Sequence, residues 1–103
     1  ENSFDFRVQK GFNTAYYSLF VVMGTREVAL QKAYLWPDDQ DDAFKDMQPH
    51  VGSIVECVLI APKRWKALRV RTDRHAPNAL SEVKKTSHME AAALLQMWSC
   101  WTA

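Results

Sequence analysis

The sequence lacks the features that would assign it to a membrane-spanning or metal-binding class. No apolar run approaches the ~20 residues that a transmembrane helix needs, and no signal peptide is visible. The histidines, His50, His75 and His88, share no metal-ligand spacing with either of the two cysteines. The formal net charge of +1 favours no particular partner. We therefore expect neither a membrane span nor a metal centre in this chain.

Cysteine is scarce, and Cys57 and Cys100 lie far apart in the chain. A single disulfide between them stays open as one alternative. A reduced pair of small buried hydrophobic residues fits the composition better, because the chain already has enough apolar residues to form a core.

The sequence does contain that core. Hydrophobic residues make up 48% of the chain and aromatic residues 12%, which argues against disorder. A length of 103 residues suits one domain and is short for two. The chain opens at Glu1 without an initiator methionine, already inside an expected strand. We therefore expect residues 1–103 to be a single domain cut from a longer protein.

The charges are unevenly distributed along the chain. Acidic residues crowd one stretch: Asp38, Asp39, Asp41, Asp42 and Asp46. Basic residues crowd another: Lys63, Arg64, Lys66, Arg69, Arg71 and Arg74. The acidic run predicts a solvated loop, with repulsion of nucleic acid or binding of a basic partner as alternatives. The basic stripe can create a local anion site although the whole chain is nearly neutral.

The first half of the chain predicts three strands. Phe4, Phe6 and Val8 alternate with polar residues, as a half-buried strand requires. Residues 15–23 are rich in aromatic and β-branched side chains, which fits a strand buried on both faces. Residues 27–36 form a third strand that Pro37 ends.

The second half predicts one helical turn at residues 43–48 and two further strands at residues 53–60 and 64–72, joined by a short hairpin loop. The whole pattern is mainly β: about 1–74 supply the strands, and about 78–101 form a helical tail. A helix is expected over residues 78–85, with Asn78 as its N-cap.

The rest of the tail carries clear helix signals. Ser87 and Glu90 have the spacing of a capping box. Beyond them, apolar side chains follow at helical spacing: Ala91, Leu94, Leu95, Trp98 and Trp101.

The fifth expected strand carries a pair of arginines. Alternation along a strand puts Arg69 and Arg71 on one face, together with Trp65 and Ala67, and about 6–7 Å apart at 3.3 Å per residue. That separation suits the binding of two neighbouring phosphates. Asp73 can pair with an arginine and fix its rotamer, and Arg74 adds a third cation just past the strand. A solvated strand face without a ligand is the plain alternative.

A specific string surrounds these arginines. V-E-C is followed by W-x-x-x-R-x-R-T-D-(K/R), and then by P-N. It resembles the last nucleotidyltransferase motif of eukaryotic and viral mRNA capping enzymes. The opening N-S-F-D-F-R resembles the N-T-x-D-F-(R/K) stretch at which that family's catalytic domain passes into its OB domain. DNA ligases share a related R-x-R-x-D-K motif, but the tryptophan and the Pro-Asn pair favour capping enzymes.

The resemblance implies a fold and a set of roles. The fold is a five-stranded OB-fold-like barrel with a C-terminal helical segment. Arg69, Arg71 and Arg74 are expected to contact the β and γ phosphates of GTP when this domain closes as a lid, and Asp73 to orient them. Arg74 stands where the family usually has lysine, so the charge is kept while the fork geometry differs.

The resemblance also implies what surrounds the domain. The chain has no K-x-D-G motif, so we expect it to be inactive alone and to serve a guanylyltransferase that forms lysyl-GMP and passes GMP to 5′-diphosphate RNA. GTP is the implied substrate, with Mg²⁺ or Mn²⁺ bound mainly by the missing catalytic domain. The implied partners are that nucleotidyltransferase domain of the same protein and the 5′ end of RNA, with RNA polymerase left open. The implied location is the nucleus, or the site of viral transcription for a viral protein.

Two other functions stay open. The chain fits a stand-alone OB module that binds single-stranded nucleic acid, with Trp65 as a stacking platform. It also fits the OB domain of an ATP-dependent polynucleotide ligase. Among the remaining residues, Glu56 is expected to face solvent or pair with an arginine, Cys57 to lie in the core, and His75 to be a solvated loop residue.

Overall fold

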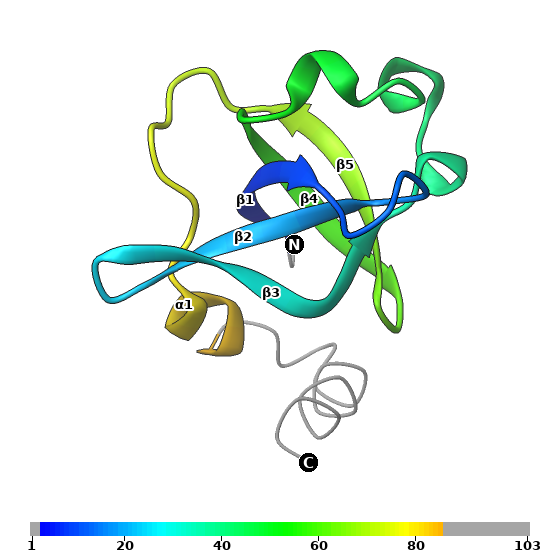
Figure 1. The fold of residues 1–103 in the computed structure, drawn as a ribbon. Coiled ribbons are helices and arrows are strands. Elements are labelled where there is room, and N and C mark those ends of the chain that lie inside the picture. Colours follow the sequence, from blue (N-terminus) through cyan, green and yellow to red (C-terminus); the bar gives the residue numbers. More distant parts are fainter. Residues whose placement is uncertain (1–2, 86–103) are drawn as a thin grey trace.

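The protein folds into a ring of five strands (Figure 1). The computed structural model describes residues 3–85. The strands run in the chain order β1 (Ser3–Lys10), β2 (Tyr17–Met23), β3 (Arg26–Leu35), β4 (Ile54–Ala61) and β5 (Arg64–Val70). Three short 3₁₀ segments lie between β3 and β4: η1 (Pro37–Asp39), η2 (Asp42–Phe44) and η3 (Gln48–His50). The helix α1 (Leu80–Lys85) follows β5.

The ring closes in the spatial order β1-β2-β3-β5-β4. Neighbouring strands are antiparallel except β3 and β5, which are parallel. This is the strand order of an OB-fold, and it confirms the mainly β, five-stranded barrel expected from the sequence. No helix within residues 3–85 is long and apolar enough to cross a membrane.

The expected elements differ from the observed ones in detail. β5 ends at Val70, two residues before the predicted end. β2 is buried on one face only, because Leu19 and Val21 point into the barrel while their neighbours are partly exposed. The prediction that β2 is buried on both faces was therefore wrong. In place of the single helical turn predicted at residues 43–48, two short 3₁₀ segments, η2 and η3, overlap the two ends of that range.

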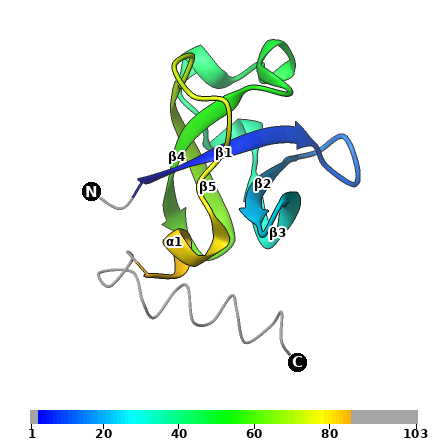
Figure 2. The same ribbon diagram turned by 90° about the vertical axis from the view of Figure 1, so that its left-hand side faces the viewer.

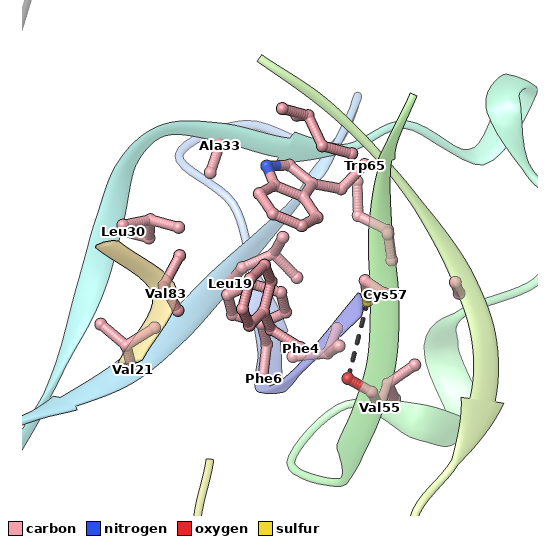
Figure 3. Packing of buried hydrophobic residues seen from close by; sticks show 14 of the residues in the cluster. Phe4, Phe6, Leu19, Val21, Leu30, Ala33, Val55, Cys57, Trp65 and Val83 are labelled. Carbon is pink, nitrogen blue, oxygen red and sulfur yellow. Dashed lines mark hydrogen bonds between the residues drawn. The ribbon is translucent and has the colours of Figure 1, made fainter. Parts of the chain in front are cut away.

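The core fills the interior of the barrel around Trp65 (Figure 3). Phe4 and Phe6 of β1 meet its indole edge-on, with ring centroids 6.2 and 4.9 Å away. Such edge-to-face contacts add to the stabilisation from apolar burial. Cys57 is free and fully buried, and its Sγ–H donates to the Val55 carbonyl. Burial raises the pKa of this thiol, so it behaves as the core residue that the sequence predicted.

The parallel seam between β3 and β5 is short, and one side chain extends it. The two strands share a single Cα pairing, Tyr34 with Arg64. Beyond it, the buried Gln40 replaces the missing strand partner: its Oε1 accepts from the Ala67 N–H at 2.6 Å, and its Nε2 donates to the Trp65 carbonyl at 3.0 Å. A side-chain amide therefore satisfies the backbone groups that a longer β3 would have paired.

Helix α1 closes one end of the barrel (Figure 2). Val83 is fully buried and lies beside Val21 and Leu30 in Figure 3. Asn78 does not act as the N-cap predicted for it, because its Oδ1 accepts instead from the backbone N–H of Asp5. Glu82, the third residue of α1, accepts from the Ala79 N–H, which is the contact that a capping box makes from the helix back to the residue before it. The predicted capping box and the apolar stripe at residues 87–101 lie outside the described residues.

The Gln40 seam gives a stability prediction. Gln40→Ala should lower the free energy of unfolding by about 2–4 kcal/mol, because at least two buried backbone groups lose their partners at about 1–3 kcal/mol each. Urea denaturation of the domain measures this loss. Gln31→Ala is the matched control, since Gln31 is exposed on β3, and it should change stability by less than about 0.5 kcal/mol. Equal effects of the two substitutions would contradict the role of Gln40.

Candidate phosphate-binding site

A β-bulge in β5 decides which way the arginines point. Cys57 pairs with Ala67 and Glu56 pairs with Arg69, so Leu68 is an extra residue on β5. The bulge shifts the alternation by one residue. Ala67 before it faces the core, whereas Arg69 after it faces outward. The prediction that Arg69 shares a face with Trp65 and Ala67 was therefore wrong: the arginine lies on the outside of the barrel.

Arg69 is the most accessible of the site arginines, with a side chain that is 64% exposed. Its Nε donates to Glu56 Oε1 at 2.6 Å. The other oxygen of Glu56 accepts from the Ser3 hydroxyl of β1. These two hydrogen bonds, the Ser3 bond first, hold the pKa of Glu56 below its usual range. Glu56 is thus the arginine partner that the sequence allowed it to be.

Arg71 has carboxylates on both sides. Its Nε and Nη2 donate to the two oxygens of Asp73, each at 3.1 Å, in a fork-shaped pair. Its Nη1 lies 3.3–3.4 Å from both oxygens of Asp5. The Asp73 hydrogen bond raises the pKa of Arg71, and the same bond lowers the pKa of Asp73. The predicted pairing of Asp73 with a neighbouring arginine is observed.

Arg74 also binds Asp5, the buried carboxylate that Arg71 contacts. Its Nη1 donates to Asp5 Oδ2 at 2.7 Å. The Asp5 side chain is only 6% exposed. The backbone of Asp5 is also occupied: its N–H donates to Asn78 Oδ1 at 2.6 Å, and its carbonyl accepts from the Asn78 N–H at 2.8 Å. Asp5 therefore joins the start of β1 to the segment that follows β5.

The role of Asp5 in this cluster was not predicted from the sequence. It was expected as a polar residue on the outer face of an alternating strand and as part of the opening N-S-F-D-F-R string, without a role of its own. Its position between Phe4 and Phe6 and its place in the opening N-S-F-D-F-R string gave no sign of its partners. The partners, Arg71 and Arg74, lie more than sixty residues away in the chain.

The basic stripe is neutralised to a large extent by carboxylates. Three arginines of the site, Arg69, Arg71 and Arg74, face three acidic partners, Glu56, Asp5 and Asp73. Elsewhere on the stripe the acidic run supplies the counter-charges, through Arg64–Asp39 at 2.9 Å and Lys66–Asp41 at 3.0 Å. The run is thus a set of 3₁₀ segments that partly pair with β5, and not wholly a solvated loop. Attraction of an anion here depends on geometry more than on net charge.

Trp65 cannot serve as a stacking platform in this structure. Its side chain is fully buried, and its Nε1 has no hydrogen-bond partner within the described chain. A nucleobase stacks only on an accessible ring face. The part of the nucleic-acid hypothesis that rested on Trp65 is therefore wrong. His75 is exposed, as predicted, and its carbonyl accepts from Arg7 at 2.9 Å.

Other candidate sites lie apart from the arginines. A pocket of about 230 Å³ is formed by the β1–β2 connection, and its lining includes Lys10, Phe12, Tyr16 and Gln48 but none of the site arginines. Within residues 3–85, no group of three or more His, Cys, Asp or Glu side chains is arranged to hold a metal ion. The outward arginines of β5 are therefore the group with the clearest chemistry.

Fold and site together define an OB-fold domain with a paired arginine cluster at the end of its fifth strand. Residues 1–89 match the protein family described as mRNA capping enzyme, C-terminal domain, and the chain belongs to this family. No curated protein sequence matches the chain. The family assignment confirms the resemblance carried by the R-x-R-T-D string and by the opening N-S-F-D-F-R.

The depressed pKa of Glu56 gives a prediction for the pH dependence of stability. A carboxyl whose pKa is lowered by folding stabilises the folded state above its unfolded pKa, and this contribution is lost as the pH falls through the folded value. Glu56→Gln should therefore lower the melting temperature at pH 7, and the gap to wild type should shrink below about pH 4. Thermal melts from pH 7 to pH 3 measure the gap. A gap that stayed constant over this range would contradict the role of the Ser3 and Arg69 contacts.

Proposed function

We propose that this domain is the lid of an mRNA capping guanylyltransferase and closes on GTP so that Arg69, Arg71 and Arg74 contact the β and γ phosphates. The observation that carries the proposal is the outward orientation of Arg69 and Arg71 past the Leu68 bulge, within a chain of the capping-enzyme family. Both guanidiniums project from the end of one strand and can approach a triphosphate held by another domain.

The chemistry explains why such a lid is useful. A lysine amine of the nucleotidyltransferase domain attacks the α phosphorus of GTP, the bond to the β-phosphate oxygen breaks, and pyrophosphate leaves with the negative charge. Guanidiniums on the β and γ phosphates neutralise that charge and hold the leaving group in line with the nucleophile. Opening of the lid then admits the 5′-diphosphate end of RNA, which accepts the GMP. The chain supplies the clamp, and by this proposal it is inactive without the K-x-D-G lysine.

The ion pairs of the site are compatible with this role. Asp73 is 69% exposed, and exposed ion pairs contribute little to stability because water screens them. A triphosphate carries several charges and can replace Glu56 at Arg69, or share Arg71 with Asp73. Asp5, in contrast, is buried and keeps its hold on Arg71 and Arg74. The clamp is therefore set in place before GTP arrives, with Asp73 as its exposed and exchangeable counter-ion.

The remaining parts of the proposal follow from the same reaction. Mg²⁺ or Mn²⁺ would be bound mainly by the nucleotidyltransferase domain of the same protein, where it assists the transfer at the α phosphate. The partners are that domain, GTP and the 5′ end of RNA, with RNA polymerase as a further candidate. The location is the nucleus, or the site of viral transcription if the protein is viral.

Arg69→Ala in the full-length enzyme tests the clamp with little risk to the fold, because this side chain is largely exposed. We expect lysyl-GMP formation to fall by at least about 10²-fold, as for the loss of a charged transition-state contact. Transfer of labelled GMP from GTP to the protein measures it. Arg26→Ala is the matched control, since Arg26 is an exposed cation at the β2–β3 turn, and it should load GMP normally.

Arg71 needs a more conservative substitution. Arg71→Ala removes one partner of the buried Asp5, so we expect loss of GMP loading together with a lower melting temperature. Arg71→Lys keeps the charge but loses the fork that binds Asp73, and it should fold while loading GMP poorly. Wild-type loading in both Arg69→Ala and Arg71→Lys would refute the clamp.

The two rival functions make different predictions. A ligase domain would support loading of AMP, so competition between GTP and ATP in the full-length protein separates it from a guanylyltransferase. A stand-alone nucleic-acid module would bind a labelled oligonucleotide at micromolar concentration with strong salt dependence. With Trp65 buried and most of the basic stripe paired, we expect no such binding by this domain at moderate salt.

A further inference from the structure

Two carboxylates, Asp5 and Glu56, lie next to each other on the outer face of the barrel, and without cations nearby they would destabilise the fold. Asp5 of β1 is directly opposite Glu56 of β4, and Glu56 is directly opposite Arg69 of β5. Two carboxylates facing each other across neighbouring strands repel. Asp5 is in addition almost completely buried, and a buried carboxylate without a cationic partner is strongly destabilising. The position therefore requires arginines close by.

Those cations are two of the proposed phosphate ligands. Asp5 Oδ2 accepts from Arg74 at 2.7 Å and lies 3.3 Å from Nη1 of Arg71, so one oxygen atom bridges both guanidiniums. The side chains of Arg71 and Arg74 are 22% and 35% exposed, which leaves part of each guanidinium accessible. Arg74 follows β5 in a turn in which its N–H donates to the Arg71 carbonyl at 3.3 Å. Both the backbone turn and the Asp5 bridge thus fix the spacing of the pair.

We propose that Asp5 is a positioning residue for guanylyl transfer, which holds Arg71 and Arg74 at the spacing required by the β and γ phosphates of GTP. This inference rests on the lid function proposed above and adds to it a residue that touches no substrate. Asp5 acts through geometry: it contacts one nitrogen of each guanidinium, while the other nitrogens of Arg71 contact the exposed Asp73, which a phosphate can replace. Asn78 supports it by binding both backbone groups of Asp5, so the strand cannot shift beneath the pair.

Geometry and charge predict opposite effects for one substitution. Asp5→Asn removes a negative charge next to two phosphate ligands, so net charge alone predicts tighter binding of GTP and faster loading. Positioning predicts the reverse, because the neutral amide has no charge to hold the two guanidiniums and its NH₂ group replaces one of the oxygens that Arg71 contacts. A displacement of about 1 Å in a group that binds the reacting part can cost roughly 10²-fold in rate.

The test uses the full-length enzyme and single-turnover formation of lysyl-GMP. For Asp5→Asn we expect the maximal rate to fall by at least about 10-fold, while the GTP concentration for half-maximal rate changes by less than about 3-fold. Asp42→Asn is the matched control: Asp42 is exposed in η2, and within residues 3–85 it has no ion pair, so both parameters should stay at wild-type values. A wild-type or faster rate in Asp5→Asn would overturn the proposal.

Asp5→Glu guards against simple loss of folding. It keeps the charge and both acceptor oxygens but moves them by about one C–C bond, roughly 1.5 Å. We expect a folded protein, judged by its melting temperature, whose maximal rate is reduced at least about 10-fold. A wild-type rate would show that only the charge matters, and an unfolded protein would show that Asp5 serves the fold alone; either result overturns positioning.

The outcome for Arg69→Ala separates this proposal from the lid function. Within the described residues, Arg69 forms no hydrogen bond or ion pair with Asp5, so its loss tests the clamp directly. If Arg69→Ala abolishes loading while the Asp5 variants load normally, the lid function stands and positioning by Asp5 is wrong. If Arg69→Ala and Arg71→Lys load normally, the lid function itself is wrong.

Discussion

The buried carboxylate of Asp5 is the constraint on which the candidate site depends. Alternation along β1 puts Phe4 and Phe6 into the core and Asp5 on the outside, where the segment after β5 covers it. A covered carboxylate needs cations and hydrogen-bond donors, since its desolvation is otherwise uncompensated. Arg71 and Arg74 supply the cations, and Asn78 binds the backbone of Asp5. The contacts that compensate the buried charge of Asp5 also fix the positions of the guanidiniums of Arg71 and Arg74.

The arginines of the site are paired with carboxylates, so the cluster attracts anions more weakly than an unpaired basic patch would. Three arginines matched by three carboxylates create little long-range attraction, so a lone phosphate gains little by approaching them. In the proposed function, a triphosphate delivered at close range by a partner domain exchanges its own oxygens for Asp73 at Arg71 and for Glu56 at Arg69. Asp39 and Asp41 neutralise the basic residues at the other end of β5. Long-range attraction of anions to this face is therefore weak, which suits the proposed delivery of GTP by a neighbouring domain.

The sequence predicted the strands and the arginine motif because both are local patterns. Alternation identified the core face of β1, and the R-x-R-T-D string is short and specific. The direction of Arg69 could not be predicted, because the bulge at Leu68 depends on the register of β5 against β4. The bridging role of Asp5 and the seam made by Gln40 were missed for the same reason. Each depends on partners that are distant in the chain and become neighbours only when the barrel closes.

The most direct measurement of the central claim is a crystal structure of the full-length enzyme with GTP bound and this domain closed. The account predicts hydrogen bonds from Arg69 and Arg71 to the β and γ phosphates, with the contacts of Asp5 to Arg71 and Arg74 unchanged. A closed complex in which the arginines stay turned away from the phosphates, or in which Asp5 releases both of them, would contradict it.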